Sequence, residues 1–223
     1  MSDFLDLLSQ RHAAEQFDPT ASITRSEIET LVQEASQAPS TFNLQHWRFV
    51  AITDPQIRAQ LSTTTIPPNR QRVVDASVIF VILGDLEAHR SLSEILEQSV
   101  KAGTLTREIA DLWESTANQL YGANPHFARE RWFGPSLLLR WCSCSQPAIM
   151  GLPVARSDSL RICYEKSCGP AIGNIPLMMI TVGRDASINR KRRSRLPVSQ
   201  ILSFDAFTEF SADKTIEAAR DAE

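Results

Sequence analysis

The chain has 223 residues, of which 43% are hydrophobic and 22% charged, so it is long enough for one globular domain with a sizeable core. Its formal net charge of −3 gives no reason to expect a nucleic-acid partner or an acidic membrane surface as a partner. No apolar run approaches the ~20 residues of a membrane-spanning helix, and residues 1–4 lack the basic start of a signal peptide. We therefore expect a cytoplasmic protein.

The first clear helix signal is a capping box. Thr24 can cap the helix start while Glu27 reaches back to it. Apolar residues then recur at the spacing of one helical face, at Ile28, Leu31, Val32 and Ala35. Pro39 is expected to end this helix. The alternating stretch 48–53 that follows predicts a strand.

Further helices and strands follow along the chain. Asp54 and Pro55 supply a cap and a first-turn proline, so a second helix is predicted there. Two continuous apolar runs are typical of strands buried on both faces. Two longer stretches are predicted to be helices, and Gly103 is expected to end the first of them. These runs are 78–83 and 177–183 for the strands, and 86–100 and 106–120 for the helices. Helices outnumber strands, which predicts an α+β or α/β layered architecture, and without repeats or a linker we expect one domain.

The stretch 38–49 carries the chemistry. It reads Ala-Pro-Ser-Thr-Phe-Asn-Leu-Gln-His-Trp-Arg-Phe and brings a hydroxyl, two carboxamides and an indole into one polar loop. Carboxamides donate and accept hydrogen bonds, which suits a flat heterocycle with alternating donors and acceptors. An Arg-His block lies before it at 10–17, and a basic Arg-x-Arg-x-Pro block lies late, at 190–197. In order and spacing these blocks resemble the nitroreductase family of flavin enzymes.

The resemblance implies a nitroreductase-like α+β fold, with a mostly antiparallel sheet flanked by helices, in an intertwined homodimer with FMN at the interface. The whole chain, 1–223, would form this one domain. NAD(P)H would give a hydride to the flavin N5, and a nitroaromatic, a quinone or a similar small acceptor would then take the electrons. Because the cofactor carries the chemistry, we expect no catalytic side chain and no metal. The tail after Arg195, with Phe204, Phe207 and Phe210, is a candidate arm for wrapping the partner.

The resemblance also assigns cofactor-binding roles. Arginines near both ends would hold the phosphate and ribityl chain, the polar loop would lie along the flavin, and the block at 69–77 would meet the pyrimidine edge and supply a cation near N1. The residues are Arg11, His12, Ala13, Ser40, Asn43, Gln45, Asn69, Arg72, Arg193 and Arg195.

Each block also has a structural interpretation without a ligand. The basic run 190–195 can be a solvated face. Arg11 and His12 can cap the C-terminal end of the first helix. The stretch 40–47 can be a loop that satisfies its own backbone, and the tail can be a frayed terminus.

Three residues depart from the family pattern. Ala13 replaces a serine, so one hydrogen bond to phosphate or ribityl can be missing. Glu15 stands where the family often has a cation, and a carboxylate near a reduced flavin would oppose its charge. His46 replaces a proline.

The segment 131–168 does not fit. It holds all four cysteines, where the family has a long apolar helix and a Gly-Leu-x-Ser-Cys-Pro turn. When residues 133–159 are back-translated and the DNA is read two bases out of frame, permitted codon choices encode an amphipathic helix followed by this turn. This leads to the hypothesis of two compensating frameshifts in the gene or its recorded sequence. The competing hypothesis is a zinc site formed by Cys142, Cys144, Cys163 and Cys168.

Other functions remain compatible with the sequence. They are a same-fold flavin enzyme with different chemistry, such as dehalogenation, a flavin-binding protein without turnover, and a defective product that lacks FMN. A yellow colour would exclude the last, and NAD(P)H oxidation with a nitroaromatic would separate an enzyme from a binder.

Overall fold

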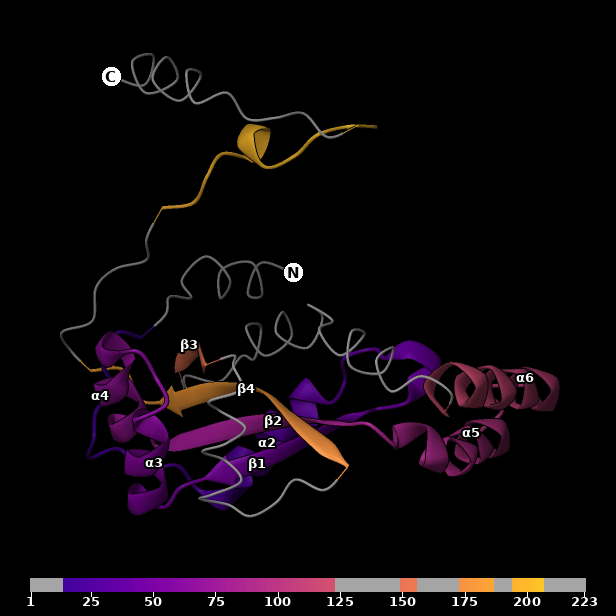
Figure 1. Ribbon diagram of the computed structural model, residues 1–223, viewed down its shortest axis with the longest axis horizontal. Coiled ribbons are helices and arrows are strands. Elements are labelled where there is room, and N and C mark those ends of the chain that lie inside the picture. Colours follow the sequence, from indigo (N-terminus) through magenta and orange to yellow (C-terminus); the bar gives the residue numbers. More distant parts are fainter. Residues whose placement is uncertain (1–13, 123–148, 156–172, 187–193, 207–223) are drawn as a thin grey trace. The chain divides into compact units, whose positions relative to one another are not determined.

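The computed structural model describes residues 14–122, 149–155, 173–186 and 194–206 (Figure 1). The chain divides into two compact units, Met1–Lys191 and Arg192–Glu223. The first contains a four-stranded sheet with its helices. In the second, the described residues form the short 3-10 helix η4 (Val198–Gln200). Within the described parts, no helix is long and apolar enough to cross a membrane.

The sheet has the strand order β1-β2-β4-β3, and every neighbouring pair is antiparallel. The strands are β1 (Trp47–Ile52), β2 (Val78–Asp85), β3 (Ile149–Ala155) and β4 (Asn174–Gly183). The predicted helices with a mostly antiparallel sheet are therefore confirmed for the described residues. β3 lies at an edge, which is where a strand tolerates a proline such as Pro153.

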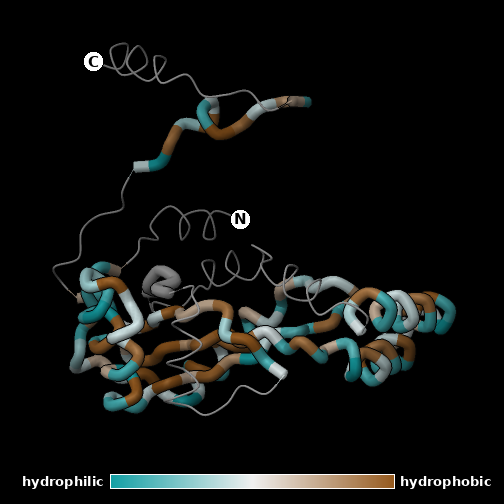
Figure 2. Tube along the Cα trace, in the orientation of Figure 1, coloured by the Kyte–Doolittle hydropathy of each residue, from teal (hydrophilic) through white to brown (hydrophobic). Residues whose placement is uncertain are grey.

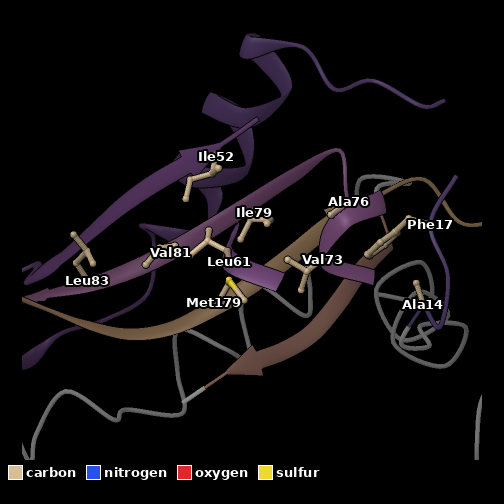
Figure 3. Packing of buried hydrophobic residues seen from close by; sticks show 10 residues of the cluster. All are labelled: Ala14, Phe17, Ile52, Leu61, Val73, Ala76, Ile79, Val81, Leu83 and Met179. Carbon is tan, nitrogen blue, oxygen red and sulfur yellow. The ribbon is translucent and has the colours of Figure 1, made fainter. Parts of the chain in front are cut away.

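Strand β2 separates two apolar layers, because alternate residues of a strand point to opposite faces. One layer joins β2 to α3 (Pro55–Ser62) and α4 (Pro67–Asp75), with Ile79, Val81, Leu83, Leu61 and Val73 (Figure 3). The other joins β2 to α2 (Arg25–Ala35), with Val78, Phe80, Ile82, Leu31 and Ala35. The first seven residues of β2 are buried, which confirms the prediction of a strand buried on both faces.

Two predicted helix starts are confirmed by their caps. The Glu27 carboxylate accepts the Thr24 backbone N–H at 2.7 Å, and the Glu27 N–H donates to the Thr24 hydroxyl oxygen at 3.2 Å. At the start of α3, Asp54 Oδ1 accepts the N–H groups of Gln56 and Ile57 at 2.7 and 3.1 Å. These local bonds satisfy donors that a helix start leaves unpaired.

A helical hairpin follows β2. It consists of the 3-10 helix η2 (Ala88–Ser91), α5 (Leu92–Lys101), α6 (Arg107–Ala117) and the π-helical turn η3 (Asn118–Gly122). Gly103, with φ +70°, ends the first arm as predicted. Apolar and polar residues alternate along both arms (Figure 2), and the apolar ones form a third cluster that includes Leu92, Leu96, Ala110, Ala117 and Tyr121.

Candidate functional site

The loop from Ser40 to Gln45 has an unusual backbone. Phe42, Asn43 and Gln45 have φ values of +54°, +56° and +44°, in the left-handed region that side chains other than glycine rarely adopt. Each such residue costs of order 1–3 kcal/mol, which the surrounding structure must offset, and such residues cluster at functional sites. The loop is therefore held in a shape that local preference opposes.

Hydrogen bonding and apolar packing hold this shape. Within the loop, the backbone N–H of Gln45 donates to the hydroxyl oxygen of Ser40 at 3.0 Å. Below it, Leu44 is buried in the cluster of the α5–α6 hairpin, and the Phe42 ring meets the Trp113 ring edge-on with centroids 6.1 Å apart. The loop is thus anchored by its apolar residues, while the carboxamide-bearing Asn43 and Gln45 are exposed and available to a ligand.

Beyond the loop, a charged pair joins β1 to β2. Arg48 Nη2 lies 2.6 Å from Asp85 Oδ2, and the Asp85 N–H donates to the carbonyl of His46 at 2.9 Å. The pKa of His46 is lowered from 6.5 to about 4, chiefly by burial; the charge of Asp85 opposes this change and the positive charge of Arg48 adds to it. His46 is therefore neutral at pH 7. Asp85 was not among the sequence-predicted residues, since only the register of β1 on β2 brings it to the loop.

A second polar group lies on α4. Arg72 Nη1 donates to the amide oxygen of Asn69 at 3.2 Å, and Arg72 Nε donates to the backbone carbonyl of Glu15 at 3.5 Å. Both α4 side chains are half-buried. Burial lowers the pKa of Arg72, and the charge of Glu15 opposes that change. Asn69 and Arg72 are thus brought together on α4, whereas their predicted contact with a pyrimidine edge stays a prediction.

The two polar groups lie at opposite ends of β2. Gln45 lies two residues before β1, whose first residue Trp47 pairs with Gly84 near the end of β2. In contrast, α4 is followed after two residues by Val78, the first residue of β2. The strand has 8 residues, so its ends are about 23 Å apart. Figure 1 likewise shows α4 and α5 at opposite ends of the sheet. Within one chain, the polar loop and the Asn69–Arg72 pair therefore do not form a single site.

The remaining predicted site residues fall elsewhere. Arg195 belongs to the second unit, where its Nη1 donates to the carbonyl of Ser194 at 3.2 Å. Arg11, His12, Ala13 and Arg193 lie outside the described residues, as do Phe207 and Phe210.

The segment 131–168 is described only at β3, whose backbone pairs with β4 with two register shifts. Cys142, Cys144, Cys163 and Cys168 lie outside the described residues, so the zinc and frameshift hypotheses are not tested by the structure. In the parts that are described, no group of three or more His, Cys, Asp or Glu side chains is placed to hold a metal.

Comparisons with known proteins support the family resemblance of the sequence. The Nitroreductase family model matches residues 8–119, half of the chain, ending before the segment 131–168. The chain is 30% identical over 197 residues to the CLA biosynthesis enone reductase of Lactiplantibacillus plantarum, covering 83% of this chain and 87% of that protein. It is 27% identical over 210 residues to "Putative NAD(P)H nitroreductase YodC" of Bacillus subtilis (strain 168), covering 90% and 98%.

Solved structures show the same fold. A "putative nitroreductase in complex with FMN" from Exiguobacterium sibiricum 255-15 has a TM-score of 0.74 at 20% identity, covering 92% of this chain and 98% of that chain. The crystal structure of the enone reductase CLA-ER has a TM-score of 0.72 at 25% identity and covers 92% of this chain. With its antiparallel sheet, its motif blocks and these relatives, the chain belongs to the nitroreductase family and is an oxidoreductase.

Proposed function

We propose that the protein is an FMN-dependent oxidoreductase that passes electrons from NAD(P)H to a nitroaromatic, a quinone or a similar small acceptor. The observation that carries the proposal is the half-buried Arg72 guanidinium, bonded to the Asn69 amide at 3.2 Å. A half-buried cation favours a negative charge beside it, and an amide supplies both a donor and an acceptor. These groups fit the pyrimidine edge of a flavin.

When bound, FMN supplies the redox chemistry, by which two electrons pass from NAD(P)H to the acceptor. The protein's residues would bind and orient it. Arg11, His12, Arg193 and Arg195 would hold the phosphate and ribityl chain, and Ala13 would contribute only its backbone there. Ser40, Asn43 and Gln45 would lie along the ring system, with Asn69 and Arg72 at the pyrimidine edge.

The distance between the two polar groups supports a homodimer in which each site takes residues from both subunits. The loop at Ser40–Gln45 of one copy would then face α4 of the other. The second unit supports the same assembly, because its described residues expose five large apolar side chains that a partner surface could cover. They are Leu196, Val198, Ile201, Leu202 and Phe204, with exposed fractions of 49–80%. On this proposal the chain is a single domain, 1–223, and the second unit is an arm of it.

A second acceptor class has its own support. The 30% identical relative is named an enone reductase. An activated carbon–carbon double bond accepts two electrons, as a nitro group or a quinone does, so the same bound flavin could serve it. The sequence of the site does not separate these acceptors, and a parallel assay does.

The proposal is tested on the purified full-length protein. We expect a flavin absorption spectrum, release of FMN on denaturation, and a dimer by analytical ultracentrifugation. NADH or NADPH oxidation should accelerate with a nitroaromatic, a quinone or an α,β-unsaturated ketone, and the rates should rank these acceptors. A protein that is colourless and does not bind added FMN would refute the proposal, and a yellow protein that never oxidises NAD(P)H would be a binder without turnover.

A further inference from the structure

The backbone of Glu15 is held in a fixed place beside the Arg72 guanidinium. Its neighbours Ala14 and Phe17 are 0% and 2% exposed and belong to the apolar layer that contains Val73 of α4 (Figure 3). Because α4 carries Arg72 next to Val73, this packing sets the segment around Glu15 against the same helix. The backbone of such an anchored segment cannot move far without disrupting the core.

The same segment is pinned to the end of β4. The Asp18 N–H donates to the Arg184 carbonyl at 3.0 Å, and the Ala186 N–H donates to the Gln16 carbonyl at 3.2 Å. The Phe17 ring lies directly over Gly183, where an added Cβ would come within 2.9 Å of it. The backbone after Glu15 is therefore fixed by hydrogen bonds and close packing, and Ala14 before it is fixed by burial.

Arg72 contacts this fixed segment. Its Nε donates to the Glu15 carbonyl at 3.5 Å, and both side chains are half-buried. Burial lowers the pKa of Arg72, and the negative charge of Glu15 opposes that change. Charges interact more strongly in such a partly buried place than in water. The Glu15 carboxylate is thus carried by a fixed backbone that contacts the cation that the proposed flavin would meet.

We propose that Glu15 is a positioning residue that lowers the reduction potential of the bound flavin by neutralising part of the Arg72 charge. This inference rests on the proposed function. A cation near N1 favours the reduced flavin, which carries negative charge there, and a carboxylate beside that cation reduces the benefit. A flavin with a lower potential is a stronger reductant, so Glu15 suits the enzyme to acceptors that are hard to reduce.

The test compares flavin potentials by equilibration with a reference dye. Glu15→Gln should bind reduced FMN more tightly relative to oxidised FMN by about tenfold, which raises a two-electron potential by about 30 mV. Glu15→Asp keeps the charge and should stay within twofold of the wild type, whereas Glu15→Lys should shift the ratio further upward. Glu29→Gln removes the same charge from an exposed pair with Arg25 on α2, and should leave the potential unchanged.

A double-mutant cycle tests the route through Arg72. Arg72→Gln alone should lower the potential, and in that background Glu15→Gln should lose at least half of its effect. An unchanged or lower potential in Glu15→Gln, or a full effect without Arg72, would overturn the inference. If the wild type binds FMN and either of these contradicting outcomes is measured, the role of Glu15 is refuted while the proposed function stands. If the wild type does not bind FMN in a fluorescence titration, the proposed function fails and the inference with it.

Discussion

The backbone N–H of Gln45 donates to the hydroxyl oxygen of Ser40 at 3.0 Å, closing a loop in which three residues have left-handed backbones. Ser40→Ala removes the acceptor, and losing one such bond costs about 1 kcal/mol. We expect FMN affinity to fall about fivefold, because the loop that should lie along the flavin is less well held. Fluorescence titration measures this. Ser36→Ala, which removes a hydroxyl bonded to the Gln33 carbonyl at the end of α2, is the matched control and should keep the affinity of the wild type.

Gln45→Gly should separate stability from binding. Glycine adopts the φ of +44° without strain, so we expect the free energy of unfolding to stay level or to rise by up to about 1 kcal/mol. FMN affinity should nevertheless fall, because a carboxamide is lost. Urea denaturation and flavin titration measure the two effects. Thr41→Gly, in the same loop but without a positive φ, should lower stability, and a Gln45→Gly variant with unchanged FMN affinity would remove this side chain from the site.

Arg195→Ala should lower FMN affinity at least tenfold. A charge-assisted bond to phosphate contributes roughly 1.5–3 kcal/mol, and arginine binds phosphate oxygens in pairs. Titration with FMN and with riboflavin, which lacks the phosphate, makes the test specific, since riboflavin affinity should change little. Arg107→Ala, which removes an exposed arginine paired with Glu97, provides the control. Equal losses for FMN and riboflavin would place Arg195 away from the phosphate.

His46 should make the fold sensitive to acid. Its pKa is about 4 in the folded chain and near 6.5 when unfolded. Between these values the unfolded state binds more protons, so stability is present above about pH 6.5 and is lost as the pH falls toward 4. Because the side chain is only half-buried, we expect a loss of about 1–2 kcal/mol. In urea denaturation, His46→Gln should lose less stability than the wild type between pH 7 and 4.5, with parallel behaviour above pH 7.

The segment 131–168 gives a prediction about the protein itself. A segment read in the wrong frame has no selected apolar face, and such a defect costs several kcal/mol. If the frameshift hypothesis holds, a stable yellow dimer made from the native gene will not yield the tryptic peptides 132–140 and 141–156 as printed. Intact mass spectrometry with peptide mapping measures this. Recovery of both peptides from such a dimer would show that the segment is genuine and tolerated.

The helix caps and the buried strand could be predicted because their signals are local. Each helix start is indicated by residues close together in sequence, Thr24 with Glu27 and Asp54 with Pro55. The apolar run of β2 is explained by its central place in the sheet. The left-handed backbones at Phe42 and Gln45 could not be predicted, because neither residue type signals a positive φ. The contact of Arg72 with Glu15 joins residues 57 apart in sequence, and only the packing of α4 creates it. The separation of the two polar groups likewise follows from strand register.

That separation along β2 has a genetic consequence. If each site draws its loop from one subunit and its α4 residues from the other, two differently damaged chains can rescue one another. In a mixed dimer of a loop-defective chain with an α4-defective chain, one site inherits both lesions and the other inherits none. Two inactive alleles of this single gene would then complement in one cell, whereas two alleles damaged at the same end of β2 would not.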